Sequence, residues 1–304
     1  MSITFRTYQS PQDYQRISAF LIENHQPSNR DGNWLEPAWE YMHAHPNFVP
    51  DDMDRFGIWA NKGKIVAIVH YEDRLGKAFF QIKPGYSHLR SEMLTYAEEQ
   101  LASPPNDQGT RQLCAYINDF DEPFVELAKS RGYQHTPEDD RPMAIVNIPE
   151  PFPNTQLPPG FHLTSLAEQP DWVKVNRVMW RGFNHPGEPD GRPEELESRR
   201  QMFDTITARR ALKIAVVAPN GDFVAFCGMF YQPQNRFAYV EPVATDPEYR
   251  RMGLGKAAVL EGIRRCAELG ATRAFVGSNQ TFYLALGFRV IYVSQCWCKN
   301  WRPE

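Results

Sequence analysis

A loop in the second half of the chain combines two glycines with cationic side chains. It reads Arg250-Arg251-Met252-Gly253-Leu254-Gly255, continues into Lys256, and lies between a predicted strand and a predicted helix. Glycine lets the backbone approach a ligand closely, and the N–H groups of a first helical turn have no partner within the helix. The helix dipole adds about half a positive charge. The pattern therefore predicts an anion site, and its charge favours a pyrophosphate over a single carboxylate.

Two other phosphate-binding motifs fit this loop less well. Gly253-x-Gly255-x-x-Ala258 satisfies the dinucleotide fingerprint G-x-G-x-x-[G or A]. However, a charged turn at 246–251 separates the loop from its strand, a predicted antiparallel meander precedes it, and arginines are not part of that fingerprint. A Walker loop is excluded, because it requires Ser or Thr at Ala257 and a glycine near Tyr249.

The loop resembles the acyl-CoA loop of the GNAT N-acetyltransferase superfamily, whose pattern is [Arg or Gln]-x-x-Gly-x-[Gly or Ala]. Family members typically continue with Asn, with Tyr four residues later, and then with Gly-Phe. The matching positions here are Arg250, Gly253, Gly255, Asn279, Tyr283, Gly287 and Phe288. The resemblance covers roughly residues 161–301 and, more faintly, the first half. It implies acetyl-CoA as co-substrate and a tandem arrangement of two GNAT-like domains.

Acetyl transfer to an amine requires a neutral nucleophile, a stabilised oxyanion and a proton for the departing thiolate. The resemblance assigns the proton to Tyr283, since a tyrosine with a pKa near 10 can protonate a thiolate of pKa around 8.5. A core tyrosine is the alternative. Glu241 is the candidate general base, acting directly or through water. The alternative is that Glu241 is a solvated carboxylate on a strand. Asn279 is expected to hydrogen-bond the pantetheine arm or to cap the helix that follows it.

The strand before the loop supplies backbone groups. Its period of two predicts that Glu241, Val243 and Thr245 share a face. The resemblance implies that backbone of this strand pairs with the pantetheine amides and that one N–H meets the oxyanion. The expected cofactor-binding residues are Val243, Ala244, Thr245, Arg250, Arg251, Met252, Gly253, Leu254, Gly255, Lys256 and Asn279. His185 and Glu188 lie in a loop that follows the first predicted helix of the second half. They either contact the acceptor or belong to a polar turn.

The elements that position these residues recur along the chain. With 304 residues, two domains of about 150 are expected. Asn147–Gly160 holds five prolines and reads as a linker. We therefore predict domains at 1–146 and 161–304, joined by 147–160. Each half shows a strand, a helix, a hairpin (57–69 and 214–226), a strand, a helix and a Gly-aromatic end. This order predicts two α/β domains, each a mostly antiparallel mixed sheet flanked by helices.

The first half lacks the candidate site residues. Aligning Pro84 with Pro247 places Ser87 at Arg250, Arg90 at Gly253 and Glu92 at Gly255. The same alignment places Ala78, Phe124 and Ala128 at Glu241, Asn279 and Tyr283. A carboxylate at a helix N-terminus repels phosphate. The N-terminal domain is thus expected to be a degenerate copy that packs against the active domain or shapes its cleft, with a second ligand left open.

Composition limits the class of partner. A net charge of -4 and a pI near 6.1 do not indicate the excess of positive charge that binds nucleic acid or an anionic membrane. The N-terminus lacks an apolar signal region, so the cytoplasm is expected. Five scattered cysteines predict no disulfide framework and fit a reducing compartment. Cys296 and Cys298 share a strand face, but no second pair accompanies them, so no metal site is expected.

These patterns together predict an N-acetyltransferase that moves an acetyl group from acetyl-CoA to a primary amine, with a small-molecule acceptor favoured. The alternative, from a different class, is a non-catalytic acyl-CoA-binding sensor or scaffold that keeps the loop and has lost the chemistry. No motif identifies the acceptor, the acyl length or the oligomeric state.

Overall fold

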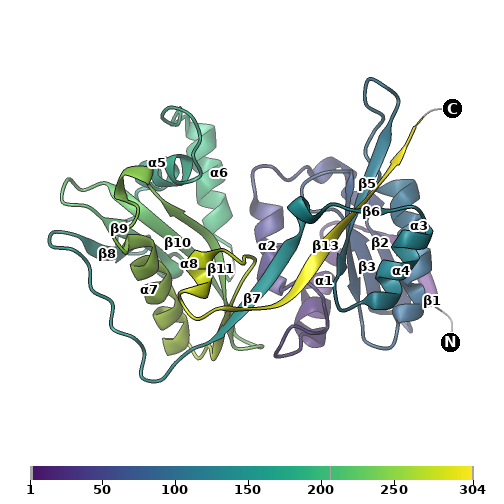
Figure 1. Cartoon of the computed structure of the whole chain (residues 1–304), viewed down its shortest axis with the longest axis horizontal. Helices are drawn as coiled ribbons and strands as arrows, with labels where there is room; N and C mark the ends of the chain where they lie inside the picture. The colour runs from purple at the N-terminus through teal and green to yellow at the C-terminus, as the bar shows by residue number, and fades with distance from the viewer. Residues whose placement is uncertain (1–2, 206, 303–304) are drawn as a thin grey trace. The chain divides into compact units, whose positions relative to one another are not determined.

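The computed structural model describes residues 3–205 and 207–302 and forms two compact units (Figure 1). The N-terminal unit comprises Met1–His43, Asn47–Met143 and Val290–Glu304. The C-terminal unit comprises Ala44–Pro46 and Ala144–Arg289. Each unit is a sheet with helices packed on it, as the element order predicted.

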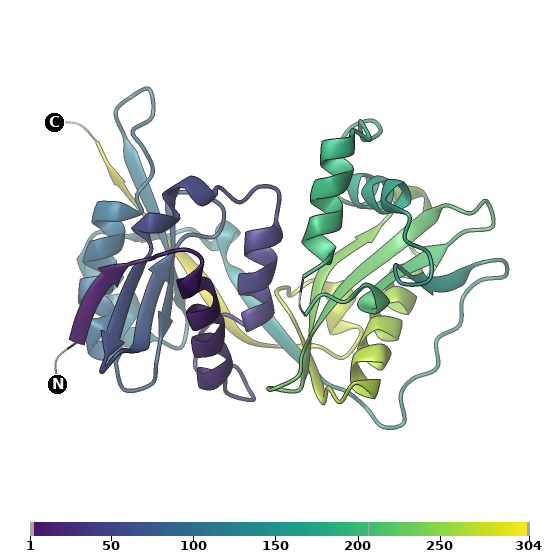
Figure 2. The same ribbon diagram turned by 180° about the vertical axis from the view of Figure 1, so that it is seen from behind.

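The N-terminal unit has the strand order β1-β2-β3-β4-β5-β13, with β6 pairing β13. Neighbouring strands run antiparallel except β4 and β5. Helices α1 and α2 cover one face of the sheet, and α3 and α4 cover the other (Figures 1 and 2). Its elements are β1 (Ile3–Thr7), α1 (Gln12–Asn24), α2 (Glu36–Ala44), η1 (Pro50–Arg55), β2 (Gly57–Asn61), β3 (Lys64–His70), β4 (Lys77–Ile82), η2 (Ser87–Leu89), α3 (Arg90–Gln100), β5 (Arg111–Asn118), α4 (Glu122–Ser130), β6 (Gln134–His135), η3 (Pro137–Asp139) and β13 (Arg289–Trp301).

The C-terminal unit has the strand order β7-β12-β11-β10-β9-β8. Helix α7 packs on one face, where Gly262 lies against Met229, and α6 packs on the other, where Phe203 meets Phe226. Its elements are β7 (Arg141–Asn147), β8 (His162–Ser165), α5 (Trp172–Gly182), α6 (Pro193–Phe203), η4 (Arg210–Leu212), β9 (Lys213–Val217), β10 (Phe223–Gln232), β11 (Phe237–Thr245), η5 (Pro247–Tyr249), α7 (Leu254–Glu268), β12 (Arg273–Val276) and α8 (Thr281–Leu284).

The two units repeat one feature that shapes the site. Each holds a single parallel pair among the recorded ladders of the described residues, β4 with β5 and β11 with β12. Each of these pairs is bonded over only three residue positions. In each case the pairing ends before the two strands do. Both predicted hairpins are also confirmed, as β2–β3 and β9–β10.

The last strand of each half pairs within the other unit. β13 lies antiparallel to β5, from Ser294 opposite Asn118 to Trp301 opposite Arg111. Residues 144–147 of β7 pair with β12. The compact units therefore divide the chain differently from the expected boundaries, because the tail packs with the N-terminal unit. A strand pattern shows that a segment will pair, but the edge that receives it presents the same backbone groups in either unit.

Two helices were not expected from the sequence. Helix α2 shows no continuous apolar stripe in the sequence, because Glu36 and Glu40 are buried on the same helix as Trp39. Helix α6 is strongly polar and buries only Met202 and Phe203 at its end. Among the described residues, no helix combines the length and the apolar character needed to cross a bilayer.

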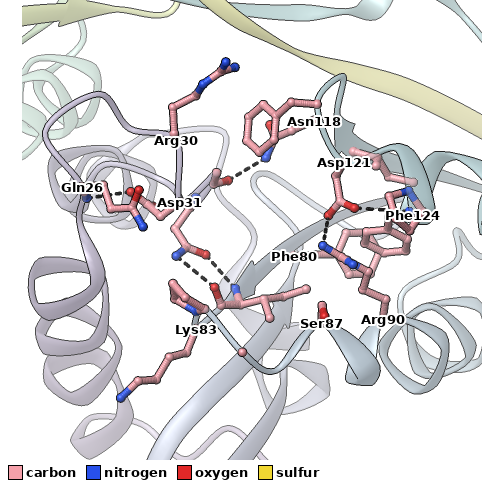
Figure 3. A pocket seen from close by; sticks show the side chains of 18 of the residues that line it. Gln26, Arg30, Asp31, Phe80, Lys83, Ser87, Arg90, Asn118, Asp121 and Phe124 are labelled. Carbon is pink, nitrogen blue, oxygen red and sulfur yellow. Dashed lines mark hydrogen bonds and ion pairs between the residues drawn. The ribbon is translucent and has the colours of Figure 1, made fainter.

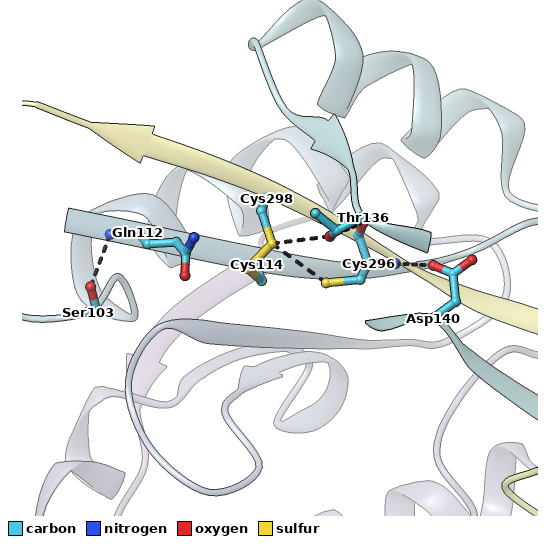
Figure 4. The surroundings of a disulfide bond; sticks show 7 residues. All are labelled: Ser103, Gln112, Cys114, Thr136, Asp140, Cys296 and Cys298. Carbon is cyan, nitrogen blue, oxygen red and sulfur yellow. Dashed lines mark hydrogen bonds between the residues drawn. A yellow bond between two sulfur atoms is a disulfide. The ribbon is translucent and has the colours of Figure 1, made fainter. Parts of the chain in front are cut away.

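The cysteines form one disulfide, although the sequence predicted no disulfide framework. Cys114 on β5 and Cys298 on β13 form a disulfide across directly opposed strand positions (Figure 4). Cys296 shares their face as predicted, and its Sγ lies 3.6 Å from the Sγ of Cys298. The three sulfur atoms lie within 4.8 Å of one another. The pairing was not predictable, because the two cysteines are 184 residues apart in sequence.

Candidate active site

The predicted anion loop joins β11 to α7 with a backbone that glycine makes possible. Arg251 and Gly253 both have left-handed backbones, with φ of 65° and 79°, and Gly253 is the N-cap of α7. A Cβ added at Gly253 would meet no atom within 4 Å, so the space beside it is open. The side chains of Arg251, Met252 and Lys256 are exposed around it. The loop therefore presents the first N–H groups of α7 and two cations to one open place.

Gly255 has a different role, which is packing. A Cβ at this position would lie 2.8 Å from the Oγ1 of Thr245, at the end of β11. Real Cβ atoms do not approach an oxygen so closely, so a side chain at residue 255 would require Thr245 or the start of α7 to shift. The two glycines of the motif thus have different roles. Gly253 faces open space, and Gly255 allows the helix to contact the strand.

The side chain of Arg250 is engaged within the protein. Its Nη2 donates to the carbonyl of Gly182 and to Oδ1 of Asn184, each at 2.9 Å, and its Nε donates to the carbonyl of Thr245 at 3.2 Å. It therefore joins the end of α5 to the loop and contributes charge at the site. Arg251 and Lys256 remain the exposed cations nearest the helix start.

Two residues that the sequence did not identify hold the loop in place. Arg181 on α5 grips Asp246, the first residue after β11, with Nε to Oδ2 at 2.5 Å and Nη2 to Oδ1 at 3.2 Å. Asp246 is buried, and its Oδ1 also accepts from the N–H of Glu248. Burial alone would raise the pKa of Asp246, but these hydrogen bonds outweigh it and lower that pKa. The sequence feature that could have indicated this pair is an arginine in the last turn of α5.

Close packing brings α5 to the same place. A Cβ added at Gly182 would lie 2.7 Å from the Cβ of Ala244 and 3.0 Å from the backbone N of Thr245. The end of α5 therefore touches the backbone of the strand proposed to bind pantetheine. Beyond it, Glu188 is paired with Arg177 and Arg181, each at 3.0 Å, and His185 stacks on Trp180 with ring centroids 4.6 Å apart. These contacts favour the polar-turn interpretation of this loop.

The parallel pairing of β11 with β12 stops before β11 reaches the loop. Their parallel pairing ends at Tyr239 and Phe275. β11 then continues to Thr245, whereas β12 ends at Val276. Asn279 follows β12 and is exposed. Helix α8 has Gln280 as its N-cap, so Asn279 is not the capping residue, and the pantetheine role is the alternative left for its side chain.

A β-bulge changes the expected face of Glu241. Cys227 pairs with Val243 and Met229 pairs with Val240, so Glu241 and Pro242 together oppose Gly228. A Cβ at Gly228 would lie 2.3 Å from the carbonyl oxygen of Glu241. Because partners across a ladder share a face, Val240 rather than Glu241 lies on the face of Val243 and Thr245. The prediction that Glu241 shares that face was wrong, since the extra residue shifts the alternation.

Tyr283 lies on α8 with 8% of its surface exposed. Its ring contacts Phe282 and Phe288 edge-on. Burial raises the pKa of Tyr283, and nearby Cys227 and Glu241 add to the rise. The hydroxyl therefore keeps its proton throughout the neutral range, and it lies close enough to Glu241 for the two groups to interact electrostatically.

The corresponding loop of the N-terminal unit is built differently. Arg90 begins α3 and pairs with Asp121 at 2.6 Å, where the C-terminal unit has open space beside Gly253. The carboxylate of Glu92 accepts from the indole Nε1 of Trp59 at 2.7 Å. Ala78, Phe124 and Ala128 are buried core residues. The alignment made from sequence is thus consistent with a loop lacking the glycine cradle.

Comparison with known proteins agrees with this fold. Residues 172–288 match the family model described as acetyltransferase (GNAT) family. No curated protein sequence matches the chain. A GCN5-related N-acetyltransferase from Sphaerobacter thermophilus is 16% identical with a TM-score of 0.66, covering 99% of this chain and 96% of its own. A tandem GNAT protein from the clavulanic acid biosynthesis pathway is 12% identical with a TM-score of 0.60, covering 100% of both chains. At these identities the structures show a shared fold.

Proposed function

Starting from a chain whose residues 172–288 form a domain of the GNAT acetyltransferase family, we propose that it transfers an acetyl group from acetyl-CoA to a primary amine. The observation that carries the proposal is the glycine loop, with the open space beside Gly253 and the N-terminus of α7 facing it. The favoured acceptor is a small-molecule amine.

The loop fits the pyrophosphate of the co-substrate. N–H groups of the first turn of α7 supply donors, and Arg251 and Lys256 supply exposed charge. Val243, Ala244 and Thr245 lie beyond the last position at which β11 pairs with β12, which supports assigning their backbone groups to the amides of a pantetheine arm. Asn279 follows β12 and is exposed, and it is assigned to the same arm.

The protein groups near this end of β11 suit acid and base roles. Tyr283 stays protonated at neutral pH and is assigned as the donor to the departing thiolate. Glu241 is assigned as the base that takes the amine proton, directly or through water. A backbone N–H beside the bulge at Glu241 and Pro242 is assigned to the oxyanion, in the manner of an oxyanion hole. Since Pro242 has no N–H, the donor on this side is Val243.

The decisive experiment is an assay of free CoA release from acetyl-CoA over a panel of primary amines, repeated with Tyr283→Phe. We expect release with at least one amine, and a fall in kcat of about a hundredfold or more in the variant. Acetyl-CoA affinity should be unchanged, because the phenolic hydroxyl is assigned to chemistry alone. Tyr292→Phe, which alters a buried tyrosine of the N-terminal unit, is the matched control.

The sensor or scaffold alternative gives the opposite result. In that case no amine releases CoA, and Tyr283→Phe binds acetyl-CoA as the parent protein does. Calorimetry adds a second criterion, because we propose one acetyl-CoA site per chain. Two equivalents bound per chain would contradict the single-site proposal without touching the catalytic one.

A further inference from the structure

The N-terminal unit has a pocket of about 330 Å³ where β4 and β5 separate (Figure 3). The parallel ladder there ends at Phe79 and Tyr116. Phe80, Ile82 and Ile117 continue along its walls, with Arg90 and Asp121 at the helix starts. The pocket is therefore the counterpart, within this unit, of the place where the pairing of β11 with β12 ends. Its volume falls in the range of small-molecule sites.

A segment of the chain occupies the strand edge at this pocket. The carboxamide of Asn33 is buried, with Oδ1 accepting from the N–H of Ile82 at 2.6 Å and Nδ2 donating to its carbonyl at 3.3 Å. Asn118 Nδ2 donates to the carbonyl of Gly32 at 2.9 Å and anchors the same segment. A pantetheine arm would need these strand groups. The remaining space is therefore suited to a shorter ligand.

The polar groups of the pocket indicate the sign of the charge on that ligand. The carboxylate of Asp31 already accepts from the N–H groups of Gln26 and Asn33, at 2.7 and 3.0 Å. Asp121 accepts from the N–H of Phe124 and pairs with Arg90. Figure 3 shows Arg90 and Asp121 facing each other on the side of the pocket opposite Asp31. The pocket's acids are thus satisfied within the protein.

Arg90 retains unused donor capacity. Its Nε is buried and has no hydrogen-bond partner among the described residues. A buried N–H without a partner is costly, and a guanidinium can serve a second acceptor besides Asp121. Arg30 and Lys83 also line the pocket, but Figure 3 shows their charged ends pointing away from Arg90, which leaves Arg90 as the cation within it. Phe80 and Phe124 provide an apolar wall, with their rings packed edge to face and the ring centroids 4.9 Å apart.

We propose that this pocket binds a small organic carboxylate with an apolar body. Arg90 meets the carboxylate, and the body lies against Phe80 and Phe124. The site is separate from the proposed acetyl-CoA site and does not depend on it. The N-terminal unit then has a ligand of its own at the position that its counterpart uses for pantetheine.

The test is calorimetric titration of the full chain with 3-phenylpropionate, with 3-phenylpropionamide as the neutral control. We expect the acid to bind and the amide to bind at least about tenfold more weakly. Saturating CoA should leave the affinity unchanged. No binding of the acid, equal binding of the amide, or displacement by CoA overturns the proposal.

Two substitutions at the pocket should act in opposite directions. Arg90→Met removes the proposed contact and should weaken binding about tenfold or more. Asp121→Asn keeps the helix cap but frees Arg90 from its competitor, so it should strengthen binding. Damage to the fold would weaken both. Arg55→Met, which breaks a partly exposed ion pair with Asp52 in the same unit, is the control and should change nothing. Binding that either pocket variant leaves unaltered contradicts the proposal.

Discussion

The guanidinium of Arg181 holds both carboxylate oxygens of Asp246, joining the last turn of α5 to the residue that leads β11 into the anion loop. The two side chains are 20% and 3% exposed, so water screens the pair only weakly. Loop geometry therefore depends on a helix that begins more than seventy residues earlier in the chain.

Asp246→Asn should weaken acetyl-CoA binding about tenfold and cost about 2 kcal/mol of unfolding free energy, because Arg181 loses its charged partner. Calorimetry and thermal unfolding measure the two effects. Arg200→Met, which breaks exposed pairs with Glu197 and Asp204, is the control and should leave binding unchanged. Unaltered binding in Asp246→Asn contradicts the positioning role.

The same pair predicts an acid dependence of stability. The pKa of Asp246 is lowered in the folded state from its usual 3.8. The pair therefore stabilises the fold fully above pH 3.8 and is lost as pH falls through the lower folded value. Acid titration of unfolding free energy should show a shallower loss in Asp246→Asn than in the parent protein. If the unfolding free energy falls equally steeply with acid in the two proteins, the pair contributes nothing to stability.

Gly255→Val should weaken acetyl-CoA binding by about tenfold, because its branched side chain would push α7 away from Thr245 and Phe282. Combining it with Thr245→Ala removes the Oγ1 that the new Cβ meets and should restore part of the affinity. Gly187→Val is the comparison, because its positive φ strains the backbone of any other residue while no atom lies near the added Cβ, so it shows the effect of strain without a steric clash. Failure of the double variant to recover affinity would place the cause elsewhere.

The raised pKa of Tyr283 predicts the alkaline behaviour of the enzyme. Activity requires the protonated phenol, and this form is lost only above an ordinary tyrosine pKa of about 10. The profile of kcat against pH should rise as the amine deprotonates and then stay level to about pH 10. A fall in kcat beginning near pH 8 that disappears in Tyr283→Phe would contradict this assignment.

Reduction of the Cys114–Cys298 disulfide should destabilise the N-terminal unit by about 2–5 kcal/mol, because the bond closes a very long loop. Thermal unfolding with and without a phosphine reductant measures the difference. Cys114→Ser should match the reduced parent protein and lose its response to reductant. Cys227→Ser, at a buried free thiol in the other unit, should keep that response. No difference on reduction would mean that the bond is absent in solution or does not restrain the tail.

Local patterns predicted most of the fold because they describe interactions between near neighbours. The glycine turns of both hairpins and the apolar stripe of α7 each lie within a short stretch of chain. Helix α2 escaped prediction because its buried Glu36 and Glu40 interrupt the apolar pattern. The face of Glu241 was mispredicted because a bulge depends on the partner strand, which the period of two does not include.

By itself, the sequence determined the glycine loop, its charge, the repeated order of elements and the absence of that loop from the first half. Only the tertiary structure decided that Arg181 holds Asp246, that Gly255 lies against Thr245, and that β13 and β7 pair outside their own halves. The physical reason is sequence distance. Backbone conformation and charge are properties of a segment, whereas a partner for a carboxylate or a strand edge is chosen among groups brought together by folding.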